Sequence, residues 1–264
     1  MKIENIFEKN FLEKPMKVEN IFEKNFLAKK NILVTGASKG IGREVAMALS
    51  AYGANVILLA RNEDSLNNVY DKIVKTYKTS PMIIKCDLNE IDENKAQEIA
   101  NVLSENISCL DGLIHNAAVL GKMSSIIDYD LNTWNKVMQT NLTSSYLLTK
   151  FLYPMMEPSI NPRVIFTSSG VVKKGRAFWG AYAISKAAIK SMSEILQDEL
   201  EPISNVKVFN FDPGATRTSM RAFAYPAEDP SSLKDASSLA NYYLWMLSDS
   251  SNNSDNRYIE FNQT

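Results

Sequence analysis

Short apolar runs alternate with longer amphipathic stretches from Asn31 to the C-terminus. Seven runs are rich in Val, Ile, Leu and Phe and therefore predict strands, at residues 31–35, 55–60, 82–86, 112–115, 163–168, 206–211 and 257–261. Stretches of helical length connect them, which is typical of a parallel sheet covered on both faces through right-handed crossovers. We therefore predict an α/β protein: a three-layer, doubly wound Rossmann fold with a seven-stranded parallel sheet. Ligand should bind at the carboxyl ends of its strands.

Residues 30–264 contain no linker, so they predict a single domain. Within it, residues 217–235 are rich in Pro, Ser, Ala and Asp and predict a loop or short helices, placed to cover a substrate. The first 29 residues form an N-terminal extension, in which residues 2–14 recur almost unchanged as residues 17–29. One interpretation is an amphipathic arm that docks on a partner. The other, which we prefer, is a tandem duplication or a start at Met16.

Composition narrows the class of protein further. The 264 residues are 45% apolar and 22% charged with a net charge of −1, which gives no electrostatic footprint for nucleic acid or an anionic membrane. There is no secretory leader pattern and no apolar run long enough to span a bilayer. Two isolated cysteines, Cys86 and Cys109, and a single histidine argue against a metal site. These features predict a cytoplasmic protein.

The segment TGASKGIG, residues 35–42, follows the first predicted strand and precedes a helical run. Gly36 permits a sharp turn, and Gly40 and Gly42 allow the backbone to approach a pyrophosphate closely. The helix that follows directs its partially positive end at the phosphates. A glycine-rich turn alone is weak evidence, but the strand–helix junction is the required context. We predict that the turn binds a dinucleotide through Gly36, Ser38, Lys39, Gly40, Ile41 and Gly42.

The end of the second strand predicts which dinucleotide binds. Proteins that prefer NAD usually carry an acidic residue there, for the ribose 2′-hydroxyl. This chain has Ala60 at that position, followed by Arg61, and a second cation, Lys39, lies in the glycine-rich turn. Two cations would attract a 2′-phosphate, which Arg can hold bidentately. The alternative is that both are solvated surface charges. We predict NADP(H).

Three residues of the run SSGVVKKGRAFWGAYAISK suggest hydride transfer at a carbonyl. Tyr182 and Lys186 are four apart, so they share one helix face. Lys186 and a nicotinamide cation should lower the pKa of the Tyr182 phenol, which then donates or accepts a proton. Ser169, just after a predicted strand, should hydrogen-bond the carbonyl oxygen as charge develops on it. The neighbouring Ser168 offers the same chemistry, so the residues alone do not decide between them.

The chain resembles a single-domain short-chain dehydrogenase/reductase. The resemblance rests on seven motifs that stand in that family's order and spacing: TGASKGIG, CDL, HNAA, QTNL, TSSG, YAISK and DPGATRT. Within this family, three segments are most similar to the YciK-type oxidoreductases of bacteria: WGAYAISK, DPGATRTSMRAFAYPAEDP and NYYLWMLSD. The resemblance selects Ser169 over Ser168. It also implies that Asn141 completes a catalytic tetrad by holding a water that relays protons to Lys186.

The same resemblance implies further cofactor contacts. Asp87 and Leu88 would contact the adenine, Pro213 and Gly214 would flank the nicotinamide, and Thr218 would contact its carboxamide. Asn116, Ala117 and Thr216 would also line the cofactor. Three residues depart from the family pattern: His115 and Ala118 in HNAA, and Asp212 before Pro-Gly. We interpret His115 as structural, and Asp212 has no assigned role.

These observations together predict an NADP(H)-dependent oxidoreductase that interconverts a small-molecule carbonyl and its alcohol by hydride transfer, without a metal. One alternative is a non-catalytic NADP(H)-binding regulator or scaffold, and another is an epimerase or dehydratase on the same fold. Met220, Phe223, Tyr225 and Pro226 fit an apolar or aromatic substrate, or they pack the lid. The resemblance implies a homodimer or homotetramer. The helices predicted near 131–153 and 182–200 are apolar enough to serve as its interface.

Overall fold

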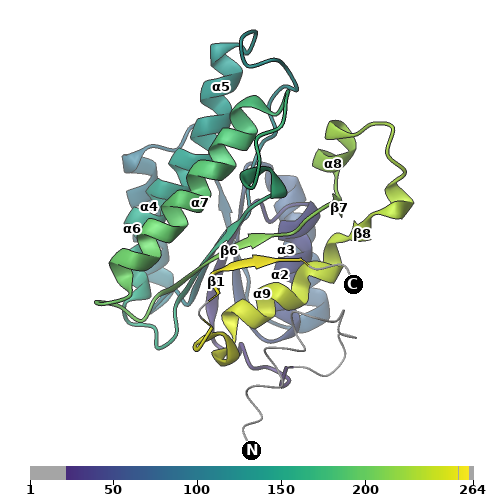
Figure 1. Ribbon diagram of the computed structural model, residues 1–264. Coiled ribbons are helices and arrows are strands. Elements are labelled where there is room, and N and C mark those ends of the chain that lie inside the picture. The colour runs from purple at the N-terminus through teal and green to yellow at the C-terminus, as the bar shows by residue number, and fades with distance from the viewer. Residues whose placement is uncertain (1–21, 255, 262–264) are drawn as a thin grey trace, which may run out of the picture.

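A seven-stranded, wholly parallel sheet forms the centre of the computed structural model, which describes residues 22–254 and 256–261 (Figure 1). Its strands are β1 (Asn31–Thr35), β2 (Asn55–Ala60), β3 (Met82–Lys85), β4 (Gly112–His115), β5 (Arg163–Thr167), β6 (Lys207–Asp212) and β9 (Tyr258–Glu260). Their order across the sheet is β3-β2-β1-β4-β5-β6-β9. The predicted fold and its seven strands are confirmed, and no strand end differs from the prediction by more than one residue.

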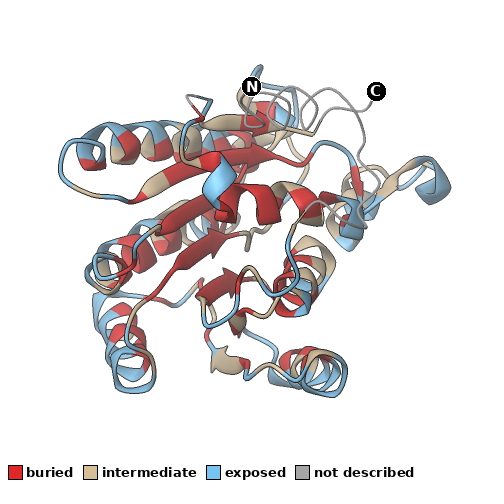
Figure 2. Cartoon of the chain, turned by 90° about the horizontal axis from the view of Figure 1, so that it is seen from below, coloured by how far each residue is buried: buried red, intermediate tan, exposed pale blue. Residues whose placement is uncertain are grey.

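Helices cover both faces of the sheet, because successive strand residues point to opposite sides. Ile32 and Val34 of β1 pack toward α2 (Gly40–Ala51), α3 (Glu63–Tyr77) and α9 (Ala240–Leu247). Leu33, between them, packs toward α4 (Glu93–Asn106), α6 (Ser144–Met156) and α7 (Gly180–Leu200). Figure 2 shows the buried sheet between the two helical layers. Burial on both faces explains why the strands read as apolar runs rather than as alternating patterns.

The strand order reverses between β1 and β4. From β1 the chain builds outward through β2 and β3, and then returns to place β4 on the other side of β1. The connections that leave the carboxyl ends of β1 and β4 therefore diverge, and they open a crevice at the position where doubly wound sheets bind ligands. The fold thus places the glycine-rich turn after β1 opposite the HNAA segment after β4.

The apolar segment predicted as one helix near 131–153 has three parts. An α-helix, α5 (Leu131–Met138), leads into a π-helical turn (Gln139–Thr143) and then into α6. A π-turn adds one residue to the helical turn and frequently marks a functional site. The residue pattern carries no signal for this local widening, so the sequence predicted a continuous helix.

The predicted lid is closed at its base by a short ribbon. Two-residue strands β7 (Thr216–Arg217) and β8 (Lys234–Asp235) pair in parallel, and the Arg217–Asp235 ion pair joins them. Between them lie α8 (Ser219–Ala224) and a 3₁₀ turn (Pro230–Ser232), so the prediction of a loop or short helices was correct but lacked the ribbon. Figure 1 shows this segment projecting from the body of the domain. The other 3₁₀ turns are Gly170–Val172, Ala236–Leu239 and Asp249–Ser251.

The end of the second N-terminal repeat packs on the domain. The rings of Phe22 and Phe26 contact Tyr52, and the backbone amide of Leu27 donates to the Tyr52 carbonyl at 3.1 Å. Leu27 is buried in the core. These residues belong to the folded unit, so its boundary lies before the predicted residue 30. The first repeat and Met16 lie outside the described residues. Among the residues described, no helix is long and apolar enough to cross a membrane.

Candidate active site

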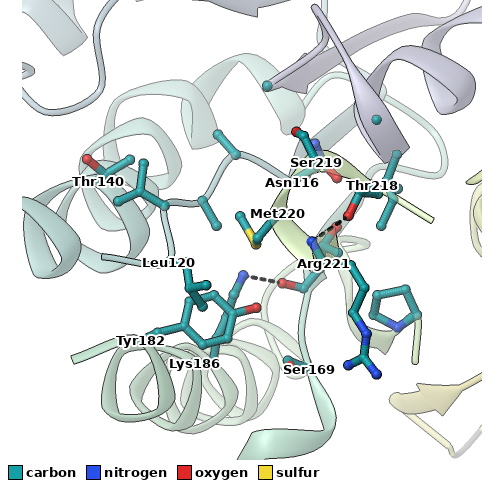
Figure 3. A pocket seen from close by; sticks show the side chains of 18 of the residues that line it. Asn116, Leu120, Thr140, Ser169, Tyr182, Lys186, Thr218, Ser219, Met220 and Arg221 are labelled. Atoms are coloured by element: carbon teal, nitrogen blue, oxygen red, sulfur yellow. Dashed lines mark hydrogen bonds between the residues drawn. The ribbon is translucent and has the colours of Figure 1, made fainter. Parts of the chain in front are cut away.

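A cleft of about 520 Å³ opens at the carboxyl ends of the strands. It is lined by the segments after β1, β2, β3, β4, β5 and β6 and by the lid (Figure 3). Every residue predicted for the catalytic and cofactor sites lines this cleft except Gly42 and Asn141. The topology therefore gathers residues that are more than 180 positions apart, from Gly36 to Thr218, around one cavity.

The glycine-rich turn has the backbone that its sequence predicts, although Gly42 serves another purpose. Gly36 has a φ of 68° and Gly40 a φ of 56°, a region that favours glycine. A Cβ on Gly42 would lie 2.4 Å from the Gly36 carbonyl oxygen and 2.5 Å from Asn116 Nδ2. Gly42 is thus required for close packing of α2 against the turn, not for an approach to a ligand. No side chain caps the N-terminus of α2, and Lys39, Gly40 and Ile41 there line the cleft.

The Thr35 hydroxyl, whose role no sequence pattern indicates, ties the two halves of the sheet together. Its Oγ1 accepts hydrogen bonds from the backbone amides of Asn116 and Ala117, each at 3.0 Å. In return, Asn116 Nδ2 donates to the Thr35 carbonyl at 3.0 Å. Thr35 is buried, so these bonds are shielded from water and fix the turn after β1 against the segment after β4.

The end of β2 carries positive charge and no acid. Ala60 ends the strand, and Arg61 and Lys39 are exposed beside it on the cleft wall. Neither cation has an ion-pair partner in the part of the chain that the structure describes. Asp87 and Leu88 form the adjoining wall after β3. This corner of the cleft is suited to an anion next to a flat, partly apolar group.

Tyr182 and Lys186 lie side by side in the first turns of α7 (Figure 3). Both are nearly buried, at 7% and 4% exposure. Lys186 Nζ donates to the Thr167 carbonyl at 2.6 Å and lies 5.9 Å from the centre of the Tyr182 ring. Ser169 lies just past β5 on the same wall, where it lowers the pKa of Tyr182. The helix and the strand end therefore bring the phenol, the ammonium and the hydroxyl together.

Burial controls the acid–base properties of this group more strongly than charge does. Burial raises the pKa of Tyr182 to about 12, although the hydrogen bond with Ser169 lowers it. Burial also lowers the pKa of Lys186 to about 8. The sequence predicted a lowered tyrosine pKa, and for the protein's own groups that direction is wrong, because desolvation penalises the phenolate.

Asn141 lies behind the cleft wall, in the π-turn. Its Oδ1 accepts from the Val119 amide at 2.8 Å. Its Nδ2 donates to the Val119 carbonyl and to Ser185 Oγ, each at 3.0 Å. Both amide protons are thus used, and the side chain fastens the segment after β4 to α7. Asn141 therefore positions two walls of the cleft relative to each other.

Asp212, for which the sequence suggested no role, is a buried carboxylate at the end of β6. Its Oδ1 accepts from the Gly214 amide at 2.9 Å. Burial raises its pKa, and its negative charge raises the pKa of both Tyr182 and Lys186. Asp212 therefore favours the protonated forms of both groups. No local sequence pattern predicts this effect of Asp212 on the two pKa values, since it depends on the distance between β6 and α7.

His115 lies outside the cleft, at the end of β4. Its Nε2 is 2.9 Å from Thr149 Oγ1, and its ring stacks on Phe166 with 4.8 Å between the ring centres. Burial, together with the charge of Lys186, lowers the pKa of His115 to about 3, so it is neutral at pH 7. In residues 22–254 and 256–261, no group of three or more His, Cys, Asp or Glu side chains could hold a metal ion.

The cleft extends beyond Tyr182 into a region that the sequence located only in part. Of the four lid residues considered, Met220 and Tyr225 line it, whereas Phe223 is exposed and Pro226 does not line it. Six further residues line this region and carry no signal in the sequence: Leu120, Val171, Arg176, Trp179, Arg221 and Ala224. They come from three separate segments, so only the folded chain brings them together.

Comparison with known proteins agrees with this geometry. The short chain dehydrogenase family matches residues 30–229. The chain is similar to the uncharacterized oxidoreductase YciK of Escherichia coli, with 42% identity over 83% of this chain and 86% of that protein. A short chain dehydrogenase from Shigella flexneri, solved with NADP, has 39% identity and a TM-score of 0.87 over 90% of this chain and 99% of its own. Another from Escherichia coli, solved with NADPH, has 40% identity and a TM-score of 0.86 over the same shares.

The burial of neutral His115 predicts a loss of stability in mild acid. Unfolded, His115 has a pKa of 6.5, whereas burial lowers its pKa in the folded chain to about 3. Below pH 6.5 the unfolded state takes up a proton that the folded state excludes, so stability falls as the pH drops. From pH 7 to pH 5 this single group should cost about 2 kcal/mol. Urea unfolding of wild type and His115→Gln at both pH values measures it. An equal loss in the two proteins would contradict this origin.

Proposed function

The chain belongs to the short chain dehydrogenase family, and we propose that it uses NADP(H) to reduce a carbonyl compound, or to oxidise the corresponding alcohol, by hydride transfer. The observation that carries this proposal is the burial of Tyr182 against Lys186 on one wall of a cleft whose other wall is a glycine-rich turn. A protein that only bound a nucleotide would have no use for a buried ammonium next to a buried phenol.

The cleft fits a phosphorylated dinucleotide. The uncapped N-terminus of α2 and the left-handed backbone of Gly36 and Gly40 suit a pyrophosphate. Arg61 and Lys39 suit a 2′-phosphate, and Ala60 offers no carboxylate to a free 2′-hydroxyl. Two similar structures hold NADP or NADPH, which supports the same preference in this chain. We place the adenine at Asp87 and Leu88, and the nicotinamide near Pro213, Gly214, Thr216 and Thr218.

Tyr182 is the proposed proton donor to the carbonyl oxygen. When bound, NADPH supplies the hydride. Because burial raises the pKa of Tyr182 to about 12, the phenol carries its proton at neutral pH, as a donor must. Ser169 would hold the same carbonyl oxygen and stabilise the charge that develops on it. Ser169 can also donate to the phenolate that remains after proton transfer.

Lys186 and Asn141 support that proton transfer. Lys186, with a pKa of about 8, is a cation at neutral pH that stabilises the phenolate and can return a proton to it. Because Asn141 uses both amide protons on protein atoms, we propose that it acts chiefly by positioning α7. The relay water implied by the family resemblance stays a prediction, with one lone pair of Asn141 Oδ1 still open to it.

Asp212 favours the reducing direction. Its charge raises the pKa of Tyr182, so that the phenol is more often protonated. A negative charge near the nicotinamide site would also favour the cationic, oxidised ring that hydride donation leaves. Both effects act together, and they agree with the use of NADPH, which usually implies reduction.

Replacement of the proposed proton donor gives the direct test. Tyr182→Phe keeps the ring and removes the hydroxyl, so carbonyl reduction should fall by at least about 100-fold. The affinity for NADPH should be nearly unchanged. Loss of NADPH absorbance is followed over a panel of aldehydes, ketones, quinones and 3-oxoacyl thioesters, with fluorescence titration for NADPH binding. Undiminished turnover in the variant would refute the role of Tyr182. Tight NADPH binding without turnover of any panel member would favour the regulator alternative.

The cofactor preference is tested at the end of β2. Arg61→Ala should weaken NADPH binding about tenfold or more, because a charge-assisted bond to the 2′-phosphate is lost. NADH, which lacks that phosphate, should be affected no more than about twofold. Arg43→Ala is the matched control, since Arg43 pairs with Glu44 on α2 and does not line the cleft. If Arg61→Ala weakened the binding of NADPH and of NADH equally, the assignment of Arg61 to the 2′-phosphate would be wrong.

We also propose that the chain forms a homodimer or homotetramer through the outer surfaces of α6 and α7. Tyr146, Ile184 and Ile195 are large apolar residues exposed there. Analytical ultracentrifugation should give a mass of two or four chains, and Ile184→Glu with Ile195→Glu should give a monomer. A monomeric wild type would contradict the proposal.

We also propose that the protein is cytoplasmic. Both cysteines are free, which supports this compartment, and cell fractionation tests it.

A further inference from the structure

The far end of the cleft has an apolar, aromatic wall. We call this region the substrate end and define it by Leu120, Val171, Arg176, Trp179, Met220 and Tyr225. Leu120, Val171 and Tyr182 form one small apolar cluster, against which Met220 and Trp179 pack. Figure 3 shows Leu120 and Met220 beside the Tyr182 ring. A carbonyl held at Tyr182 would therefore place its adjoining group among apolar side chains.

Aromatic rings lead from the tyrosine to the outer edge of this region. The Trp179 ring centre is 5.7 Å from that of Tyr182 and 5.9 Å from that of Tyr225. The Tyr225 hydroxyl accepts a hydrogen bond from Arg176 Nη1 at 3.2 Å. Arg176 thus lies one aromatic ring beyond Trp179, and a flat body would separate it from a carbonyl at Tyr182.

The two arginines at this end of the cleft differ in their pairing. Arg221 makes two hydrogen bonds with Glu228, each at 2.6 Å, and its guanidinium lies 3.7 Å from the Tyr225 ring centre. Its charge is neutralised inside the lid. Arg176, by contrast, has no ion-pair partner among the residues that the structure describes. Within the described residues its guanidinium makes one hydrogen bond, to the uncharged Tyr225 phenol, so it presents a full positive charge to the cleft.

The backbone that carries Arg176 is held in a costly conformation. The Trp179 amide donates to the Arg176 carbonyl at 3.3 Å, which closes a tight turn. Inside that turn, Phe178 has a φ of 70°, where glycine is usual. The Phe178 carbonyl accepts from the Ser124 amide at 3.2 Å, which anchors the turn to the segment after β4. Such conformations persist where the surroundings enforce them, commonly at ligand sites.

We propose that the substrate carries, besides its carbonyl, a carboxylate or phosphate at the far end of a flat body, and that Arg176 binds this anion. The inference rests on the proposed function for the position of the carbonyl. A guanidinium matches either anion with two parallel hydrogen bonds, and the partly open site spares it the full cost of desolvation. Trp179 and Tyr225 bind the flat body between the two groups.

A binding experiment tests the anion site without any turnover. Calorimetry on the complex with NADP⁺ compares para-methylbenzoate with its methyl ester, which has the same shape but no charge. The acid should bind about tenfold more tightly than the ester. Arg176→Met should remove that advantage, and Arg176→Lys should restore part of it. Lys174→Met is the matched control: Lys174 is an exposed cation two residues away that does not line the cleft, so its loss should leave the advantage intact.

A turnover experiment with para-formylbenzoate and its methyl ester completes the test. Arg176→Met should lower kcat/KM for the acid about tenfold more than for the ester, mainly through KM. An acid that binds and reacts no better than its ester, or an equal effect of Arg176→Met on both, would overturn the anion site. If neither aldehyde nor any member of the wider panel shows turnover that depends on Tyr182, the proposed function fails. The calorimetric comparison then still decides the anion site.

Discussion

Burial of a lysine ammonium beside a tyrosine is the constraint on which the rest of the site depends. Removing a charge from water is costly unless polar partners replace it. Lys186 finds one partner in the Thr167 carbonyl at the end of β5, and the negative charge of Asp212 at the end of β6 adds to it. Helix α7 connects these two strands, so it must dock with Lys186 over their ends. The protonation of the pair follows from this docking, because burial raises the pKa of Tyr182 and lowers that of Lys186.

A second requirement is that the nucleotide turn and the helix that carries Tyr182 keep a fixed position relative to each other. Thr35 fixes the turn after β1 to the segment after β4, and Asn141 fixes that segment to α7 through Val119 and Ser185. These buried hydrogen bonds connect the nucleotide turn to the helix that carries Tyr182. Hydride transfer demands alignment within fractions of an ångström. The two residues contribute to that alignment without lying at the centre of the cleft.

Much of the fold and the candidate site was predictable from local patterns, because apolar runs buried on both faces and a glycine-rich turn leave direct traces in the sequence. The sequence predicts that Gly42 lets the backbone approach a ligand, whereas in the structure the atoms that exclude a side chain there belong to Gly36 and Asn116. The π-turn around Asn141 and the direction of the Tyr182 pKa shift could not be predicted. Both depend on packing between segments that lie far apart in the sequence.

Charge along the cleft orients the proposed substrate. Asp212 is a buried carboxylate near the site assigned to the nicotinamide, and it would repel an anionic group held close to the carbonyl. Arg176, unpaired among the described residues, attracts such a group to the opposite end, beyond Trp179. Arg221 cannot compete for it, because Glu228 already occupies its guanidinium. A substrate with a carbonyl at one end and an anion at the other would therefore enter in one orientation only, with its carbonyl at Tyr182.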